Sequence, residues 1–188
     1  MWWSDRRSTG VRFARLAAAL SLAACAGGCF QPLYADRSVD GGPGLRSAMA
    51  AVDVKQIESP KGSDEARLAV EVRNALLFGL TGGGPAPRAT YSLTVRIAST
   101  VSDIIVDTTT TRPAIENYGI NATYVLTEIA SGKKVVTGQT FARVSYDIPG
   151  QEQRFARLRG LRDAETRAAK VIADNIQARL ASYFAAGT

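Results

Sequence analysis

The chain has 188 residues, of which 46% are hydrophobic and 21% charged, a composition typical of a single soluble globular domain. It contains no histidine, which excludes most general-base triads, most catalytic zinc sites and a simple pH switch near neutrality. The formal net charge is +6, but residues 1–28 hold four of the 23 basic and one of the 17 acidic residues, leaving 19 against 16. The rest of the chain is only weakly basic, so we expect no nucleic-acid partner.

Residues 1–28 have the pattern of a lipoprotein signal peptide. Residues 1–15 are rich in arginine, and residues 16–28 read LAAALSLAACAGG, an apolar stretch that only Ser21 interrupts. This stretch is too short to span a bilayer as a stable helix, and it has no amphipathic stripe. An export segment therefore explains it better than a helix of the mature fold.

Two cysteines, Cys25 and Cys29, end the apolar stretch and are candidates for a lipid anchor. Leu22-Ala23-Ala24-Cys25 matches the bacterial lipobox, and Ala26-Gly27-Gly28-Cys29 matches it more loosely. Lipidation at Cys29 leaves no other thiol in the mature chain, whereas lipidation at Cys25 leaves Cys29 free in an oxidising compartment. We therefore favour Cys29 as the residue that carries the diacylglycerol and acyl groups such as palmitate, with Cys25 as the alternative.

The first part of the mature chain is predicted to be a tether followed by a folded domain over residues 50–188. Residues 29–49 form the tether, because residues 35–49 contain turn formers and no periodicity. Residues 50–58 alternate as a strand. Ser63 caps a helix whose apolar side is Leu68, Val72, Leu76 and Leu80, and Gly82-Gly83-Gly84-Pro85 ends that helix.

The second part of the domain is predicted to hold three strands and a long helix. Alternation begins at Tyr91 and continues to residue 106, a polar loop with Arg112 follows, and residues 118–126 and 135–146 form a hairpin. From Phe155 the pattern is helical for about thirty residues, with an apolar side made of Leu161, Ala164, Ala168, Val171, Ile172, Ile176, Leu180 and Phe184. The element order β-α-β-β-β-α predicts an α+β two-layer sandwich, in which a four-stranded antiparallel or mixed sheet carries two helices on one face.

Catalytic constellations are missing from the sequence. The paired carboxylates Asp64-Glu65 stand at a helix start, where capping explains them, and no histidine can activate a serine or threonine. We therefore expect a protein that is not an enzyme and that uses no metal and no cofactor besides its covalent lipid anchor.

A family resemblance begins at the second cysteine. Cys29-Phe30-Gln31-Pro32-Leu33-Tyr34 resembles the start of mature alphaproteobacterial members of the LptE family, lipopolysaccharide-assembly lipoproteins of the outer membrane. The order of elements and the C-terminal stretch with Asp163-Ala164-Glu165 and Arg167-Ala168-Ala169 extend the resemblance over residues 29–186. It implies a lipid-anchored, periplasm-facing outer-membrane protein that plugs the LptD β-barrel as a heterodimer and assists lipopolysaccharide insertion during envelope biogenesis.

The resemblance also implies which basic residues contact lipopolysaccharide. Arg112 and Arg162 resemble basic positions of the family, and Lys133 and Lys134 in the hairpin turn are weaker candidates. An arginine fork suits phosphate, but a solvated surface residue is the alternative explanation at each position. The polar strand positions Thr94, Arg96, Thr123, Thr127, Gln139 and Arg143 fit either a polar barrel lumen or solvent.

Other functions remain open at the level of sequence. A periplasmic lipid carrier or accessory lipoprotein of an envelope transport system would need an apolar pocket between sheet and helices. A structural envelope lipoprotein without a ligand would need no basic site. An exported enzyme is the least supported class, because neither a base nor a nucleophile pair is present.

Overall fold

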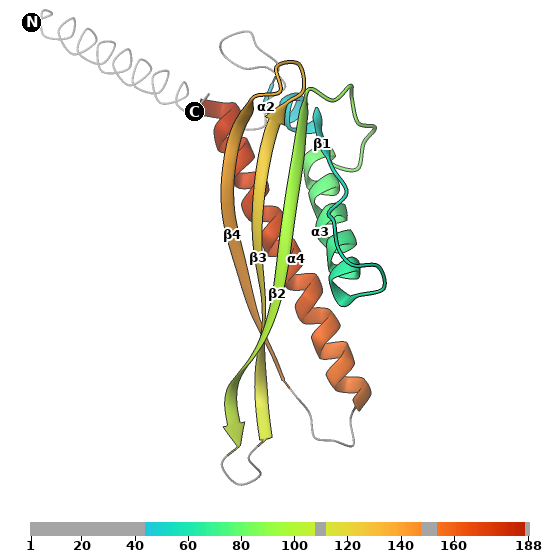
Figure 1. The fold of residues 1–188 in the computed structure, drawn as a ribbon, viewed down its shortest axis with the longest axis vertical. Helices are drawn as coiled ribbons and strands as arrows, with labels where there is room; N and C mark the ends of the chain where they lie inside the picture. The colour runs from blue at the N-terminus through green and yellow to red at the C-terminus, as the bar shows by residue number, and fades with distance from the viewer. Residues whose placement is uncertain (1–43, 108–111, 148–153, 187–188) are drawn as a thin grey trace, which may run out of the picture. The chain divides into compact units, whose positions relative to one another are not determined.

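The computed structural model describes residues 44–107, 112–147 and 154–186, and Figure 1 shows their arrangement. The export segment and both candidate anchor cysteines lie outside the described residues. The elements, in chain order, are helix α2 (Leu45–Ala50), strand β1 (Val52–Val54), helix α3 (Asp64–Thr81), strands β2 (Tyr91–Asp107), β3 (Arg112–Glu128) and β4 (Lys134–Asp147), and helix α4 (Arg154–Ala186). In the described ranges no helix is both long and apolar enough to cross a membrane.

The sheet is mixed and open, with the strand order β1-β2-β3-β4. The short strand β1 runs parallel to β2, with Val54 opposite Leu93, and α3 forms the crossover that a parallel pair requires. The other pairs are antiparallel: Ile97 lies opposite Ala122, and Ala122 lies opposite Thr140. Helices α3 and α4 pack side by side on one face of this sheet (Figure 1). The predicted α+β sandwich is confirmed.

Helix α3 begins and ends as its sequence predicts. The Ser63 hydroxyl accepts a hydrogen bond from the backbone N–H of Ala66 at 3.2 Å, and Asp64 and Glu65 occupy the first turn. Gly82 adopts φ +64° at the C-cap, a left-handed conformation that glycine adopts without steric cost. The predicted apolar side of the helix is buried at all four positions from Leu68 to Leu80.

Helix α4 runs for 33 residues and covers β3 and β4. Its buried side alternates small and large apolar residues, which lets the helix lie close to the sheet and to α3; these are Ala164, Ala168, Ala169, Ile172, Ala173, Ile176, Leu180 and Ala181. Close approach is clearest at Gly79 of α3, where a Cβ would collide with the side chain of Gln177. Val171 was predicted on this apolar side but is exposed, because the helix turns it away from both layers.

Three details of the predicted elements are wrong. Residues 45–49, predicted as the end of the tether, and Ala50, predicted to begin the first strand, form α2, because Leu45 and Met49 are buried in the core and α2 packs on α3 and α4. The chain order therefore includes a third helix. Arg112 was placed in a loop, but β3 begins at this residue and pairs it with Asp107. Lys134 is the first residue of β4, and only Lys133 remains in the turn.

Candidate functional site

Two carboxylates are buried between the layers, and they mark the polar part of the interior. Glu116 on β3 is 5% exposed and Glu165 on α4 is 4% exposed, and they are the two charged side chains buried among the described residues. A buried carboxylate needs partners that replace its lost hydration. Both have them.

Glu116 is held by one residue from the sheet and one from α4. Tyr146 lies directly opposite Glu116 in the β3–β4 register, and its hydroxyl donates a hydrogen bond to Oε2. Arg157 Nη2 lies 3.0 Å from the other oxygen, Oε1. Burial, followed by the hydrogen bond to Glu116 and the charge of its carboxylate, raises the pKa of the Tyr146 phenol, so the phenol keeps the proton that it donates. This group joins the first turn of α4 to the sheet.

Glu165 joins α4 to the start of α3. Arg67 Nη2 lies 2.6 Å from Glu165 Oε2 and 3.7 Å from Asp64 Oδ1. Burial raises the pKa of the Glu165 carboxyl, while the charge and the hydrogen bond of Arg67 oppose that rise. The Asp163-Ala164-Glu165 stretch that carried the family resemblance thus has a structural role through its glutamate.

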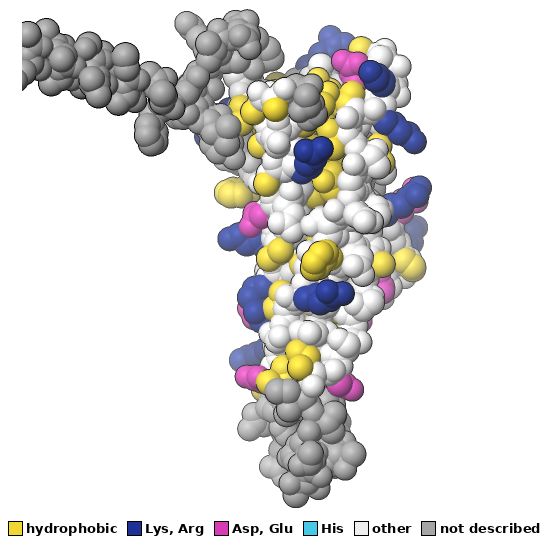
Figure 2. Space-filling view, turned by 90° about the vertical axis from the view of Figure 1, so that its left-hand side faces the viewer, with side chains coloured by type: hydrophobic (Ala, Val, Ile, Leu, Met, Phe, Trp, Pro, Cys, Tyr) yellow, Lys and Arg dark blue, Asp and Glu magenta, His cyan; other side chains and the backbone are white. Residues whose placement is uncertain are grey.

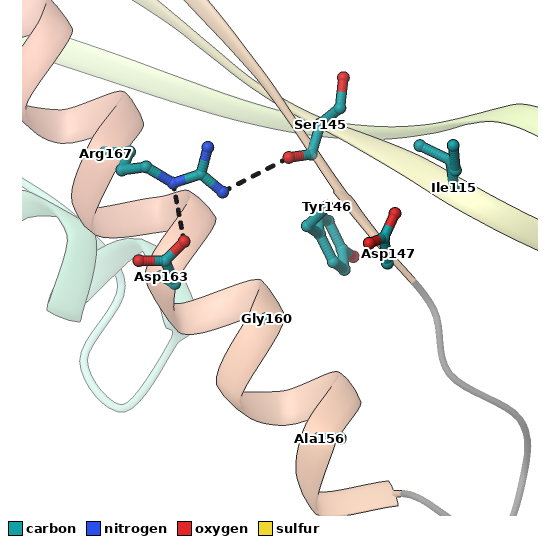
Figure 3. Close-up of a pocket in the computed structure, with 8 residues that line it drawn as sticks. All are labelled: Ile115, Ser145, Tyr146, Asp147, Ala156, Gly160, Asp163 and Arg167. Atoms are coloured by element: carbon teal, nitrogen blue, oxygen red, sulfur yellow. Dashed lines mark hydrogen bonds and ion pairs between the residues drawn. The ribbon is translucent and has the colours of Figure 1, made fainter.

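A hollow of about 500 Å³ opens between the last residues of β4 and the N-terminal half of α4 (Figure 3). Arg167 points across it, with Nε 2.7 Å from Asp163 Oδ2 and Nη2 3.4 Å from the Ser145 carbonyl oxygen. Gly160 faces the Tyr146 ring, and a Cβ there would lie 3.5 Å from the ring, an ordinary van der Waals contact. The remaining lining comes from Ile115, Asp147 and Ala156. The hollow is lined by polar and apolar surface in about equal measure. Its arginine is already engaged by Asp163 and the Ser145 carbonyl oxygen.

The basic residues predicted to contact lipopolysaccharide do not form one group. Arg112 begins β3, and Arg162 is an exposed residue of α4, two residues beyond Gly160, which itself packs against the end of β4. Lys133 and Lys134 lie at the β3–β4 turn, at the opposite end of a 17-residue strand, which corresponds to about 50 Å. The structure therefore separates the lysine pair from the end of the sheet where Arg112 begins β3. The ligand role of all four stays a prediction.

The arrangement of these side chains gives little support for a catalytic function. Within the residues that the structure describes, no three metal-ligating side chains lie close enough to share an ion. The two buried carboxylates are taken up by Tyr146, Arg157 and Arg67, which makes them packing groups rather than acids or bases open to a ligand.

Sequence reasoning missed both buried carboxylates, although each left a trace. The alternation Tyr118, Ile120, Ala122, extended two residues toward the N-terminus, places Glu116 on the helix-covered face. Glu165 likewise falls on the apolar side of α4, four residues after Leu161. A charge on a buried face predicts a partner of opposite charge, but the identity of Arg157 and Arg67 requires the fold.

The fold is similar to that of several bacterial lipoproteins of known structure. It is similar to a putative lipoprotein from Caulobacter crescentus, with a TM-score of 0.59, 21% identity, and coverage of 77% of this chain and 98% of that one. It is also similar to rare lipoprotein B from Shewanella oneidensis (TM-score 0.50, 15% identity, 71% and 95% coverage). A third neighbour is an uncharacterized lipoprotein B from Nitrosomonas europaea (TM-score 0.51, 10% identity, 73% and 90% coverage). At these identities the likeness establishes the fold alone.

The family is established by sequence. The family model described as "LptE: Lipopolysaccharide-assembly" matches residues 49–180, which is most of the described domain. The chain therefore belongs to the LptE family, a family of non-enzymatic envelope lipoproteins associated with lipopolysaccharide assembly. The comparison with curated proteins gives no match.

Proposed function

We propose that this chain is an outer-membrane lipoprotein that plugs the β-barrel of an LptD-type partner and assists insertion of lipopolysaccharide at the cell surface. The observation that carries the proposal is the family match over residues 49–180, which covers both layers of the sandwich. The cysteine pair after an export segment supports the lipid anchor, with Cys29 favoured over Cys25.

The packing of the domain is consistent with a rigid plug. The space between the layers is filled by large apolar side chains, and several of them, such as Leu76, Leu93 and Ile176, are completely buried. Interiors packed in this way are stiff and transmit force without collapsing. A lipid carrier would instead need an apolar cavity between the layers, and the hollow beside Arg167 is lined about equally by polar and apolar surface and has charged side chains, Asp147, Asp163 and Arg167, in its lining. The packing therefore favours the plug over the carrier.

Arg112 and Arg162 are the residues we propose as contacts for the phosphates of lipopolysaccharide. Arg162 is exposed, so it can reach a ligand without disturbing the core. Lys133 and Lys134 lie at the other end of the sheet, and we rank them below the arginines.

The direct test is affinity purification of the tagged, full-length lipoprotein from detergent-solubilised outer membranes, followed by mass spectrometry. We expect one large β-barrel protein in near-equal amount. Recovery of the lipoprotein alone, or with inner-membrane transporter subunits, would contradict the plug and favour the carrier.

A second experiment tests the anchor. Cys29→Ser should abolish incorporation of labelled palmitate, and Cys25→Ser should leave it intact. The reverse result would assign the lipid to Cys25.

A further inference from the structure

The face of the sheet opposite to the helices has an unusual composition. The rows at the two ends of this face hold charged residues, Lys134 opposite Thr127 and Asp147 opposite Ile115. Between them, five central rows cross β2, β3 and β4; they are Thr94-Val125-Thr137, Arg96-Thr123-Gln139, Ala98-Asn121-Phe141, Thr100-Gly119-Arg143 and Ser102-Asn117-Ser145. We call these fifteen positions the open face. Uncharged polar residues dominate it, Arg96 and Arg143 are its two charged residues, and it carries no carboxylate.

The exposed side of α4 differs from the open face. It carries charges of both signs along its length, and one pair of them, Arg167 and Asp163, forms an ion pair at 2.7 Å. Figure 2 views the molecule from the side of β4; yellow and dark blue side chains stand among white ones at its centre, and the magenta acidic groups lie at the margins. Mixed charges are typical of a surface that faces water. The helix layer meets this description, and the open face does not.

Phe141 lies in the middle row of the open face and is 61% exposed. The guanidinium of Arg143 lies over its ring at 5.3 Å from the centroid, so an aromatic and an arginine form one exposed unit. Aromatic residues and arginine are enriched at protein interfaces, whereas lysine, glutamate and aspartate are depleted there. The charged and aromatic residues of the open face, which are Arg96, Arg143 and Phe141, all belong to the enriched types.

The charges of the open face indicate the chemistry of what covers it. Neither Arg96 nor Arg143 forms a salt bridge with a carboxylate in the part of the chain that the structure describes. The Ser145 hydroxyl, by contrast, donates to Asn117 Oδ1 at 2.8 Å, so polar groups of the face also bond across strands. A complementary surface would be polar and would place carboxylates opposite the two guanidinium groups.

We infer that the open face, and not the outer side of α3 and α4, is the surface that docks against the partner protein. The surface of the partner is a polar β-sheet wall with acidic side chains that face Arg96 and Arg143. This inference rests on the proposed function, in which that wall is the lumen of the barrel, and it specifies which face meets it.

Two exposed phenylalanines provide a matched test. Phe141 lies on the open face and is 61% exposed, and Phe78 lies on α3 and is 70% exposed. Each is replaced in the full-length lipoprotein by the photo-crosslinking residue p-benzoylphenylalanine. Irradiated cells are then analysed for adducts with a β-barrel protein identified by mass spectrometry, alongside co-purification of the same barrel without irradiation.

We expect the Phe141 probe to form at least ten times more barrel adduct than the Phe78 probe. Equal adducts from both probes, or adducts from Phe78 alone, would overturn the inference and leave the proposed function standing. The inference is also overturned, and the proposed function stands, if the barrel co-purifies but neither probe forms an adduct with it. Failure of the barrel to co-purify with the unmodified protein would overturn the proposed function itself, and the inference with it.

Charge reversal gives an independent measurement. The double substitution Arg96→Glu and Arg143→Glu should reduce recovery of the barrel at least tenfold, because it places carboxylates opposite carboxylates. Lys170→Glu, on the exposed side of α4, is the control and should leave recovery unchanged. A thermal melt of each purified variant verifies that it is folded. Unchanged recovery with the folded double variant would overturn the inference.

Discussion

The two parts of helix α4 are held to the domain by different forces. From Ala164 to Ala181 the inner side of the helix is buried, and Ile172, Ile176 and Leu180 are inaccessible to solvent. In the first turns, by contrast, Phe155 is 82% exposed and Leu158 is 53% exposed. Here the contact with the sheet depends on Arg157, Glu116 and Tyr146.

This difference predicts unequal local stability within one continuous helix. Apolar burial over many turns resists opening, whereas a polar contact at a partly exposed helix end is weakened by water. The first turns of α4 should therefore open more readily than its middle. The predictions below test this comparison, in order of decreasing expected effect.

The largest loss should come from the apolar part. Ile176→Ala removes a fully buried side chain and should lower the free energy of unfolding by about 2–5 kcal/mol. Chemical denaturation of the purified domain measures this loss. Val171→Ala, on the exposed side of the same helix, should change the stability by less than about 0.5 kcal/mol. Equal losses would mean that the two sides of α4 do not differ as described.

The second-largest loss of stability should come from the polar contact of Glu116 with Tyr146 and Arg157. Glu116→Ala should cost about 1–3 kcal/mol, because it leaves the buried Tyr146 hydroxyl without its acceptor and Arg157 without its carboxylate. Glu116→Gln keeps an acceptor for Tyr146 and should cost less. Amide hydrogen exchange should speed up in the first turns of α4 in both variants and stay unchanged around Ile176. Faster exchange around Ile176 would show that the two parts open together.

Removing the Tyr146 hydroxyl, which donates the hydrogen bond to Glu116, should cause a smaller loss of stability. Tyr146→Phe removes the hydrogen bond but keeps the ring and the Arg157 ion pair, so the loss should be about 1 kcal/mol. Tyr183→Phe is the control, since the Tyr183 hydroxyl donates no hydrogen bond within the described residues and its ring packs edge-on against Phe184. If the two substitutions cost the same, the hydroxyl of Tyr146 does not stabilise the fold.

Glu165, where the apolar part begins, should produce a pH dependence. Because burial raises the pKa of the Glu165 carboxyl above its ordinary value of 4.5, the folded protein binds more protons than the unfolded chain just above pH 4.5. Stability contributed by the protonated carboxyl is present below this pH and is lost as the pH rises through the folded pKa. The stability of the wild type relative to Glu165→Gln should therefore fall between pH 4 and pH 7. A relative stability that rises over this range would contradict a raised pKa.

The smallest effect is expected at the exposed start of the helix. Leu158→Ser removes an exposed apolar side chain and should change the free energy of unfolding by about 0.5 kcal/mol or less. A loss comparable to that of Ile176→Ala would mean that Leu158 is buried in solution.

The elements could be predicted where one face of each is buried along its whole length. Ser63 and Gly82 mark the ends of α3 by local geometry, and the alternation from Tyr118 to Leu126 locates the central and C-terminal part of β3. Helix α2 was missed, because six residues are too few to display a helical period and its burial depends on α3 and α4. The start of β3 at Arg112 was missed for a related reason, since its pairing with Asp107 involves a strand that precedes it in the chain.

The candidate site was less predictable than the fold. The sequence identifies basic residues such as Arg112, Arg162 and Lys133, but it contains no information about the distance between them until the strands are paired. The buried contacts of Glu116 and Glu165 were missed because Arg157 lies 41 residues from Glu116, and Arg67 lies on a different helix from Glu165. A charge within an apolar pattern shows that a partner is required without showing which residue it is.

By itself, the sequence determined the family, the α+β class and the apolar sides of α3 and α4, because all three depend on local patterns of residues. Only the tertiary structure decided which face of the sheet remains open, which carboxylates are buried, and that Lys133 and Lys134 lie far from the end of the sheet where Arg112 begins β3. The physical reason is that these properties arise from contacts between segments distant in the chain. Pairing of β2, β3 and β4 assembles the open face row by row, and no single strand carries its composition.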